Sequence, residues 1–185
     1  LKLSYVFSLN RPIFTRNKRN NNYETTTMKQ QIIECVPNIS EGKDLKKINT
    51  IANVVTEVEG IKLLDIDPGK ATNRTVITFV GEPSQVIEAA FRLIKKAGEL
   101  IDMSKQTGEH PRFGATDVCP LIPIANISME ETANYAHMLG KRIGEELGIS
   151  GYYYENAATK EDRRRGRNNL GLSIHYCLYV ASTKR

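Results

Sequence analysis

Apolar and polar residues follow two different spacings along this chain, and the spacing changes several times after residue 30. Short apolar stretches bounded by Gly, Pro or Asn predict four strands, over residues 31–36, 61–67, 75–80 and 117–124. Between them, apolar residues recur at steps of three and four, which predicts helices over residues 45–58 and 83–101. The resulting order, strand-helix-strand-strand-helix-strand, is typical of the ferredoxin-like α+β sandwich.

This topology predicts where the fourth strand lies and how the two faces of the sheet differ. The fourth strand of a ferredoxin-like sheet lies at an edge, and here it contains Pro120 and Pro123, which are tolerated chiefly on edge strands. Both helices should cover the same face of an antiparallel sheet. The opposite face then needs a ligand, another domain or more of the chain to cover it.

Further elements are predicted beyond the four strands and two helices. Ser128 and Glu131 have the spacing of a capping box, and the apolar residues that follow at helical spacing predict a third helix. Residues 152–154 are a short strand candidate, and alternation over residues 170–180 predicts a last strand. We therefore expect a ferredoxin-like βαββαβ sandwich with an additional helix and short strand.

The two ends of the chain differ from its middle in charge. Residues 1–27 and 163–185 carry net charges of +4 and +6, so residues 28–162 carry −5 of the total of +5. No apolar period runs through residues 1–27, which we interpret as a disordered or leader segment. A leader that contains Arg and is nearly free of acids would also suit an organelle transit peptide. A nucleic-acid interaction would depend on the two ends alone.

The composition and the motifs indicate the cellular compartment and disfavour several kinds of site. The three cysteines, Cys35, Cys119 and Cys177, are widely spaced and odd in number, which argues against a disulfide framework or a zinc site. We expect a reducing compartment, the cytoplasm, unless residues 1–27 are a transit peptide. No stretch approaches the ~18 apolar residues of a membrane span, and the sequence contains no nucleotide-binding or zinc-protease motif. An RNA-binding sheet is disfavoured, because the third predicted strand has one aromatic residue, Phe79, for base stacking.

His110 is the histidine best placed in the sequence for proton transfer. It lies in a Gly-bounded loop between the second helix and the fourth strand, with Glu109 before it, and Pro111 holds it out of a helix. An imidazole titrates near neutral pH and can accept and return a proton. The alternative is a loop histidine with a structural role.

Asp67 and Arg74 lie on either side of the turn between the second and third strands. Asp65 shares a face of the second strand with Asp67, since side chains alternate along a strand. Asp67 and Arg74 would either pair with each other across the hairpin or bind an ionic ligand.

Several stretches, in a fixed order, resemble glutamate formiminotransferase. They are residues 34–42 (ECVPNISEG), 65–69 (DIDPG), 73–75 (NRT), 79–81 (FVG), 101–104 (IDMS) and 108–120 (GEHPRFGATDVCP). The resemblance covers about residues 30–165, and its motifs are too long and too regularly spaced for chance agreement. We therefore interpret residues 28–165 as the N-terminal subdomain of this family.

The resemblance implies a transferase that moves a formimino group from N-formimino-L-glutamate to N5 of the co-substrate tetrahydrofolate, a step of histidine breakdown. In this family, two ferredoxin-like subdomains hold the folate between them, and no metal is implied. The resemblance assigns His110 as the general acid/base, and Asp67 as the acid that orients this histidine or steadies its charge. We expect Arg74, Arg112 and Asn38 to bind the substrates, since a guanidinium fork suits a carboxylate.

The resemblance ends near Arg165, and residues 166–185 diverge from the family pattern. Because the second subdomain supplies much of the folate contact, the alternative is a truncated folate-binding or assembly module without turnover. In either case, the expected partners are the two substrates and a second formiminotransferase subdomain or a homo-oligomer. Neither nucleic acid nor a membrane is expected as a partner.

Overall fold

A computed structural model describes residues 10–16, 23–109, 114–159 and 176–181. Its main sheet is antiparallel, and β3 and β4 are two parts of one interrupted strand, since both pair with β6 on one side and β7 on the other. The strands of this sheet are β3 (Ile32–Cys35), β4 (Asn38–Ile39), β5 (Lys62–Gly69), β6 (Arg74–Gly81), β7 (Thr116–Ala125), β8 (Ser150–Tyr154) and β9 (Tyr176–Ala181). The spatial order β5–β6–β3/β4–β7 is the ferredoxin-like order, which confirms the predicted α+β class.

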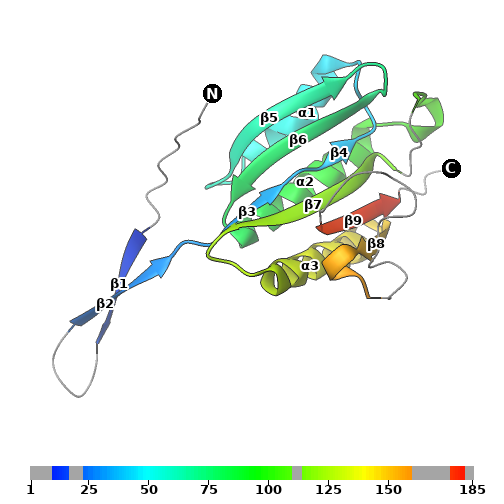
Figure 1. Cartoon of the computed structure of the whole chain (residues 1–185). Coiled ribbons are helices and arrows are strands. Elements are labelled where there is room, and N and C mark those ends of the chain that lie inside the picture. Colours follow the sequence, from blue (N-terminus) through cyan, green and yellow to red (C-terminus); the bar gives the residue numbers. More distant parts are fainter. Residues whose placement is uncertain (1–9, 17–22, 110–113, 160–175, 182–185) are drawn as a thin grey trace.

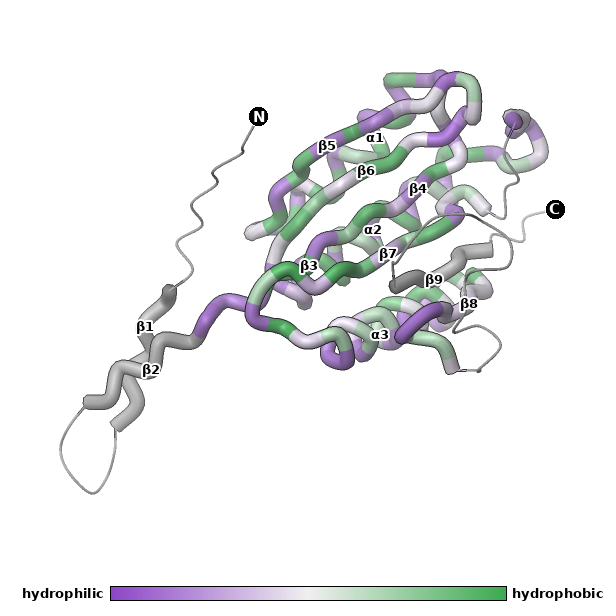
Figure 2. The backbone as a smooth tube through the Cα atoms, in the orientation of Figure 1, coloured by the Kyte–Doolittle hydropathy of each residue, from purple (hydrophilic) through white to green (hydrophobic). Residues whose placement is uncertain are grey.

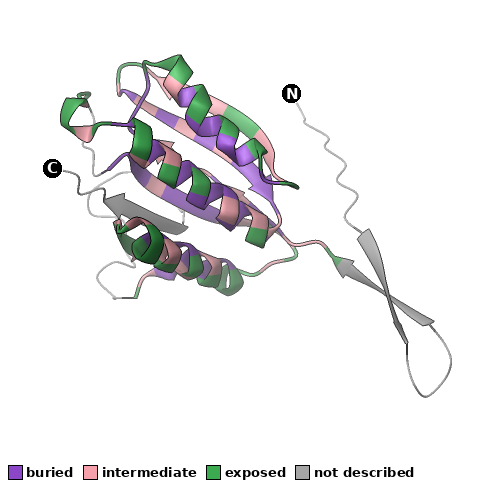
Figure 3. Cartoon of the chain, turned by 180° about the vertical axis from the view of Figure 1, so that it is seen from behind, coloured by how far each residue is buried: buried purple, intermediate pink, exposed green. Residues whose placement is uncertain are grey.

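Three helices lie on one face of the sheet, as views from both sides show (Figures 1 and 3). They are α1 (Leu45–Thr56), α2 (Pro83–Leu100) and α3 (Met129–Leu147). No helix of the described residues covers the opposite face. This matches the predicted sandwich with one additional helix.

The alternation along β6 shows how the sheet divides its residues between the two faces. Ile77 and Phe79 are fully buried and belong to the core under the helices, whereas Val76 and Thr78 are only partly buried on the other face. Hydrophobic residues are concentrated along β3, β6 and β7 (Figure 2). One core under the helices therefore holds the predicted elements together.

The ends of the helices follow the local signals in the sequence. Asp44 caps α1 by accepting a hydrogen bond from the backbone N–H of Lys47, and Pro83 opens α2. The predicted capping box of Ser128 and Glu131 is present at α3, with both reciprocal hydrogen bonds. No helix in the described part of the chain is long and apolar enough to cross a membrane.

The prediction that the fourth strand lies at a sheet edge is wrong. This strand, β7, pairs with β9, which in turn pairs with β8 at the edge. The Pro120 carbonyl accepts a hydrogen bond from the Val36 N–H. Because the nitrogen and the carbonyl of a strand residue face the same neighbour, the Pro120 nitrogen also faces β3/β4. There the partner strand is interrupted at Val36 and Pro37, and the proline therefore removes no ladder bond to β9.

The two terminal regions also contain strands. Within the predicted leader, β1 (Asn10–Arg16) and β2 (Tyr23–Lys29) form an antiparallel hairpin that is separate from the main sheet and projects from it in Figure 1. The interpretation of residues 1–27 as a disordered or leader segment stays a prediction. The short strand expected at residues 152–154 is confirmed by β8. Of the last predicted strand, β9 is present and residues 170–175 lie outside the described residues.

Candidate functional site

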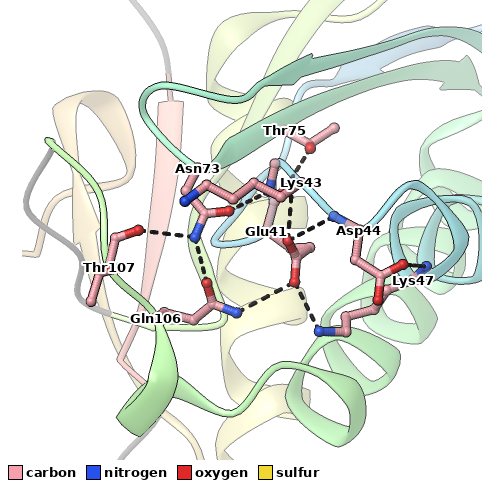
Figure 4. A network of polar contacts seen from close by, with 9 residues as sticks. Glu41, Lys43, Asp44, Lys47, Asn73, Thr75, Gln106 and Thr107 are labelled. Carbon is pink, nitrogen blue, oxygen red and sulfur yellow. Dashed lines mark hydrogen bonds and ion pairs between the residues drawn. The ribbon is translucent and has the colours of Figure 1, made fainter.

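Buried polar side chains gather at one end of the sheet, where the loop after β4, the β5–β6 turn and the segment before β7 meet (Figure 4). Among the described residues, all the buried polar side chains except Thr132 belong to these segments or to the first two residues of β6 and β7, namely Ser40, Glu41, Asn73, Thr75, Thr116 and Asp117. A buried polar group is costly unless it is hydrogen-bonded. The hydrogen bonds of these side chains therefore show which segments the cluster connects.

Glu41 is the central acceptor of the cluster. Its carboxylate accepts hydrogen bonds from the backbone N–H groups of Lys43 and Asp44, both at 3.1 Å, and from Lys47 Nζ at 2.8 Å. Gln106 Nε2 donates a longer bond of 3.4 Å to the same group. Glu41 thus joins the start of α1 to the segment that precedes β7.

The pKa of Glu41 reflects this environment. Burial raises the pKa, but the hydrogen bonds from the Lys47 ammonium and from the backbone N–H groups of Asp44 and Lys43 outweigh burial and lower it to about 2. A carboxyl group whose pKa is depressed in the folded state stabilises that state above its unfolded pKa. The contribution is lost as pH falls from about 4.5 toward 2.

We expect Glu41→Gln to lower the free energy of unfolding by up to about 3 kcal/mol at pH 7, since one pKa unit corresponds to about 1.4 kcal/mol. The difference between wild type and variant should shrink steadily below pH 4.5. Urea unfolding of both proteins at pH 7, 4.5 and 3 measures this difference. The other carboxyl groups are the same in both proteins, so their titration cancels in the comparison. A gap that does not change with pH would show that the charge of Glu41 contributes nothing.

Asn73 connects three segments through one amide group. Its Oδ1 accepts a hydrogen bond from Gly42 N at 2.9 Å, and its Nδ2 donates to Gln106 Oε1 at 2.7 Å and to the Thr107 carbonyl at 3.0 Å. The backbone of Asn73 has φ +50, a left-handed conformation that Asn tolerates better than most residues. The turn thereby places a fully bonded amide between the loop after β4 and residues 106–107.

Ser40 and Asp117 make corresponding contacts to the segment that leads into β7. Ser40 Oγ donates to the Gly114 carbonyl at 2.7 Å, and Ser40 N donates to the Ala115 carbonyl at 2.9 Å. Asp117 Oδ1 accepts from Gly114 N at 3.1 Å, and its Oδ2 pairs with Arg74 Nη2. The side chain of Asp117 is 2% exposed, so this is a buried ion pair.

A β-bulge explains why Asp117 reaches Arg74. Asn38 pairs with Val118 and Ile39 pairs with Thr116, so Asp117 is the extra residue of the bulge between these two pairs. A bulge of this kind redirects a side chain and bends the strand. It turns the carboxylate toward Arg74 instead of leaving it in the alternation of β7.

Gly42 allows the loop after β4 to lie directly against the β5–β6 turn. A Cβ atom at this position would be 2.5 Å from both Arg74 N and the Gly69 carbonyl oxygen. Both neighbours are backbone atoms of paired strands and have little room to move. Only glycine fits this close approach.

We expect Gly42→Ala to lower the free energy of unfolding by about 1–3 kcal/mol, the usual cost of overpacking. The matched control is Gly144→Ala in α3, where no atom lies within 4 Å of the added Cβ. That substitution should stabilise by up to about 1 kcal/mol through helix propensity. Chemical denaturation of both variants checks the pair, and equal effects at the two glycines would refute the close approach.

The structure brings some of the predicted site residues together and separates others. Arg74 Nε donates to Asn38 Oδ1 at 2.8 Å, so these two predicted substrate-binding residues are neighbours. Asp67 is exposed and forms no side-chain hydrogen bond or ion pair with the described residues. It shares a sheet face with Arg74 because it pairs with Val76, but the hairpin salt bridge between Asp67 and Arg74 does not form. His110 and Arg112 lie outside the described residues.

Sequence reasoning missed Ser40, Asn73 and Asp117 as site residues. All three are part of the stretches that resemble the family, and that signal would have found them. Asp117 was interpreted as the first residue of a strand, because a bulge depends on the register with a distant partner. No group of three or more metal-ligating side chains occurs among the described residues.

Comparison with known proteins gives one consistent result. Residues 32–169 match the model of the formiminotransferase domain, N-terminal subdomain. A formimidoyltransferase-cyclodeaminase of Gallus gallus is 51% identical over 134 residues, which are 72% of this chain and 25% of the relative. A glutamate formimidoyltransferase of Thermoplasma acidophilum is 48% identical over 132 residues, which are 71% of this chain and 44% of the relative. The chain thus spans between a quarter and less than half of these curated relatives.

Proposed function

Because this chain belongs to the formiminotransferase family, as the N-terminal subdomain of its transferase domain, we propose that it serves formimino transfer. The donor is N-formimino-L-glutamate and the acceptor is N5 of tetrahydrofolate. The products are glutamate and 5-formimino-tetrahydrofolate, which places the step in histidine degradation and one-carbon metabolism. No resident cofactor is needed, since tetrahydrofolate is itself a substrate.

In the proposed mechanism, His110 is the general acid/base. The N5 amine attacks the formimino carbon, a new carbon–nitrogen bond forms, and His110 accepts the N5 proton. His110 then returns this proton to the glutamate nitrogen as the bond between that nitrogen and the formimino carbon breaks. Atoms and charge balance without an oxidant, a reductant or a metal.

The other site residues have supporting roles in this proposal. Asp67 is exposed at the end of β5, so its carboxylate is available to orient His110 or to stabilise the imidazolium. Arg112 and Arg74 bind substrate carboxylates, and Asn38 holds the guanidinium of Arg74 in position. If Arg74→Ala and Arg112→Ala left the KM values for both substrates unchanged, these binding roles would be wrong.

The proposal is supported by where the stretches that resemble the family lie in the fold. Residues 38–42, 73–75 and 114–118 belong to three stretches that lie far apart in the sequence and resemble the family, and they meet at one end of the sheet. Their contacts fix Thr107 and Gly114, which flank the segment that contains His110. These parts of the resemblance therefore come together in the fold, although they are far apart in the sequence.

A folate-binding or assembly module without turnover is the second candidate. The observation that favours it is the span of the matches, because the chain corresponds to only 25% to 44% of the relatives. In that case, catalysis would require a second subdomain.

Two measurements on the same protein separate the candidates. Tetrahydrofolate binding is measured by fluorescence titration, and glutamate release from N-formimino-L-glutamate is followed with and without tetrahydrofolate. Glutamate release that depends on tetrahydrofolate supports the transferase. Binding without release supports the module, and neither binding nor release contradicts both functions.

A further inference from the structure

We propose that Asn73 and Ser40 are positioning residues that hold the segment carrying His110 from its two ends. This inference rests on the proposed function and extends it to residues outside the predicted site. Asn73 fixes the end at Thr107, and Ser40 fixes the end at Gly114. We call these two side chains the loop clamp.

The contacts on each side bind backbone atoms, which is what positioning of a segment requires. Asn73 Nδ2 donates to the Thr107 carbonyl at 3.0 Å, and Ser40 Oγ donates to the Gly114 carbonyl at 2.7 Å. Six residues, 108–113, lie between these two anchors. The two side chains thus fix the backbone on either side of this segment, at Thr107 and at Gly114.

The loop clamp is itself buried and rigidly supported. Ser40 is 0% exposed and Asn73 is 4% exposed. The backbone of Ser40 is bonded to Ala115, and the Oδ1 atom of Asn73 is bonded to Gly42 N. Each clamp residue is thus held by a second contact, through the backbone of Ser40 and through the side chain of Asn73, which is how precise geometry is maintained around a reactive group.

The loop clamp also adjoins the buried ion pair of the site. Arg74 follows Asn73 directly, and its partner Asp117 accepts a hydrogen bond from the same Gly114 that Ser40 holds. Both ends of the segment are therefore connected to one turn, residues 70–73, and to the loop after β4. The two anchors of the segment and the Arg74–Asp117 pair therefore belong to one connected set of contacts.

The test uses Asn73→Gly and Ser40→Ala. Glycine accepts the left-handed backbone of Asn73, φ +50, so Asn73→Gly removes the side-chain bonds without backbone strain. Asn126→Gly is the matched control, because Asn126 has φ 54 and its side chain donates to the Gln30 carbonyl, away from the clamp. Each change is made in the wild type and in His110→Ala.

We expect each clamp variant to lower kcat for formimino transfer by about 10- to 100-fold with a smaller change in KM, because a misplacement of about 1 Å is costly to catalysis. The control should stay within about twofold of wild type. In the His110→Ala background, the clamp variants should cause no further loss, since positioning acts through His110. Equal losses in both backgrounds, or an unchanged kcat in the wild type, would overturn the loop clamp.

Hydrogen exchange tests the loop clamp independently of turnover. The amides of residues 107–115 should exchange at least about tenfold faster in Asn73→Gly than in Asn126→Gly, while β6 stays protected. Unchanged exchange at residues 107–115 overturns the clamp even if the protein shows no activity. A wild type without transfer, or a His110→Ala variant as active as wild type, is instead a failure of the proposed function.

Discussion

His110→Ala is expected to lower kcat for formimino transfer by about 10²- to 10⁴-fold, the range that a general acid/base contributes. The loss should fall on kcat more than on the KM for either substrate, because the imidazole acts on the proton in transit and not on substrate binding. Steady-state kinetics of glutamate release, with tetrahydrofolate and N-formimino-L-glutamate varied in turn, measures both quantities.

The control for this prediction is His137→Ala. His137 lies in α3, where its Nε2 contacts the Ala157 carbonyl at 2.8 Å and its ring stacks edge-on against Tyr153. It is a helix histidine with structural contacts, and its loss should change stability and leave kcat nearly unchanged. Similar kcat values for His110→Ala and wild type would remove His110 from the mechanism.

Asp117→Ala is expected to lower the free energy of unfolding by about 3–5 kcal/mol, because it removes the carboxylate that forms an ion pair with the buried guanidinium of Arg74. The side chains of Arg74 and Asp117 are only 13% and 2% exposed, so water compensates little for the lost carboxylate. Gly114 N also loses its acceptor. Equilibrium denaturation in urea measures the effect.

The double variant Arg74→Met/Asp117→Ala supplies the comparison for this ion pair. It removes both charges, and it should be less destabilised than Asp117→Ala alone, since replacing a whole buried pair by apolar groups is often close to neutral. Arg74→Met is measured alone as well. A double variant whose loss equals the sum of the losses of Arg74→Met and Asp117→Ala would show that Arg74 and Asp117 do not interact.

The sequence predicted the elements whose signals are local. The apolar spacing of α2, the proline at its first turn and the capping box of Ser128 and Glu131 all depend on residues within a few positions of each other. The order of these elements was sufficient for the ferredoxin-like class. Strand register and pairing between distant segments carry no such local signal.

The errors share this cause. The prolines of β7 suggested that this strand lies at a sheet edge. In the structure β7 pairs with β9, whose residues are about 60 positions away, and no local signal predicts that pairing. For Arg74, the sequence left open a pair with Asp67 across a short turn or an ionic ligand. Its partner Asp117 lies 43 positions away and is turned toward it by a bulge. The candidate site itself came from the resemblance, which identified His110 but not the buried side chains around its segment.

Transfer of an isotopically labelled formimino carbon to tetrahydrofolate is the most direct test of the central claim, that this chain serves formimino transfer through His110. Labelled N-formimino-L-glutamate is mixed with tetrahydrofolate and the protein in excess, and the label is followed by NMR through a single turnover. We predict that the label appears on tetrahydrofolate with wild type and that its transfer is slowed at least about 10²-fold by His110→Ala. Label that stays on glutamate with wild type, or moves equally fast with both proteins, would contradict the account.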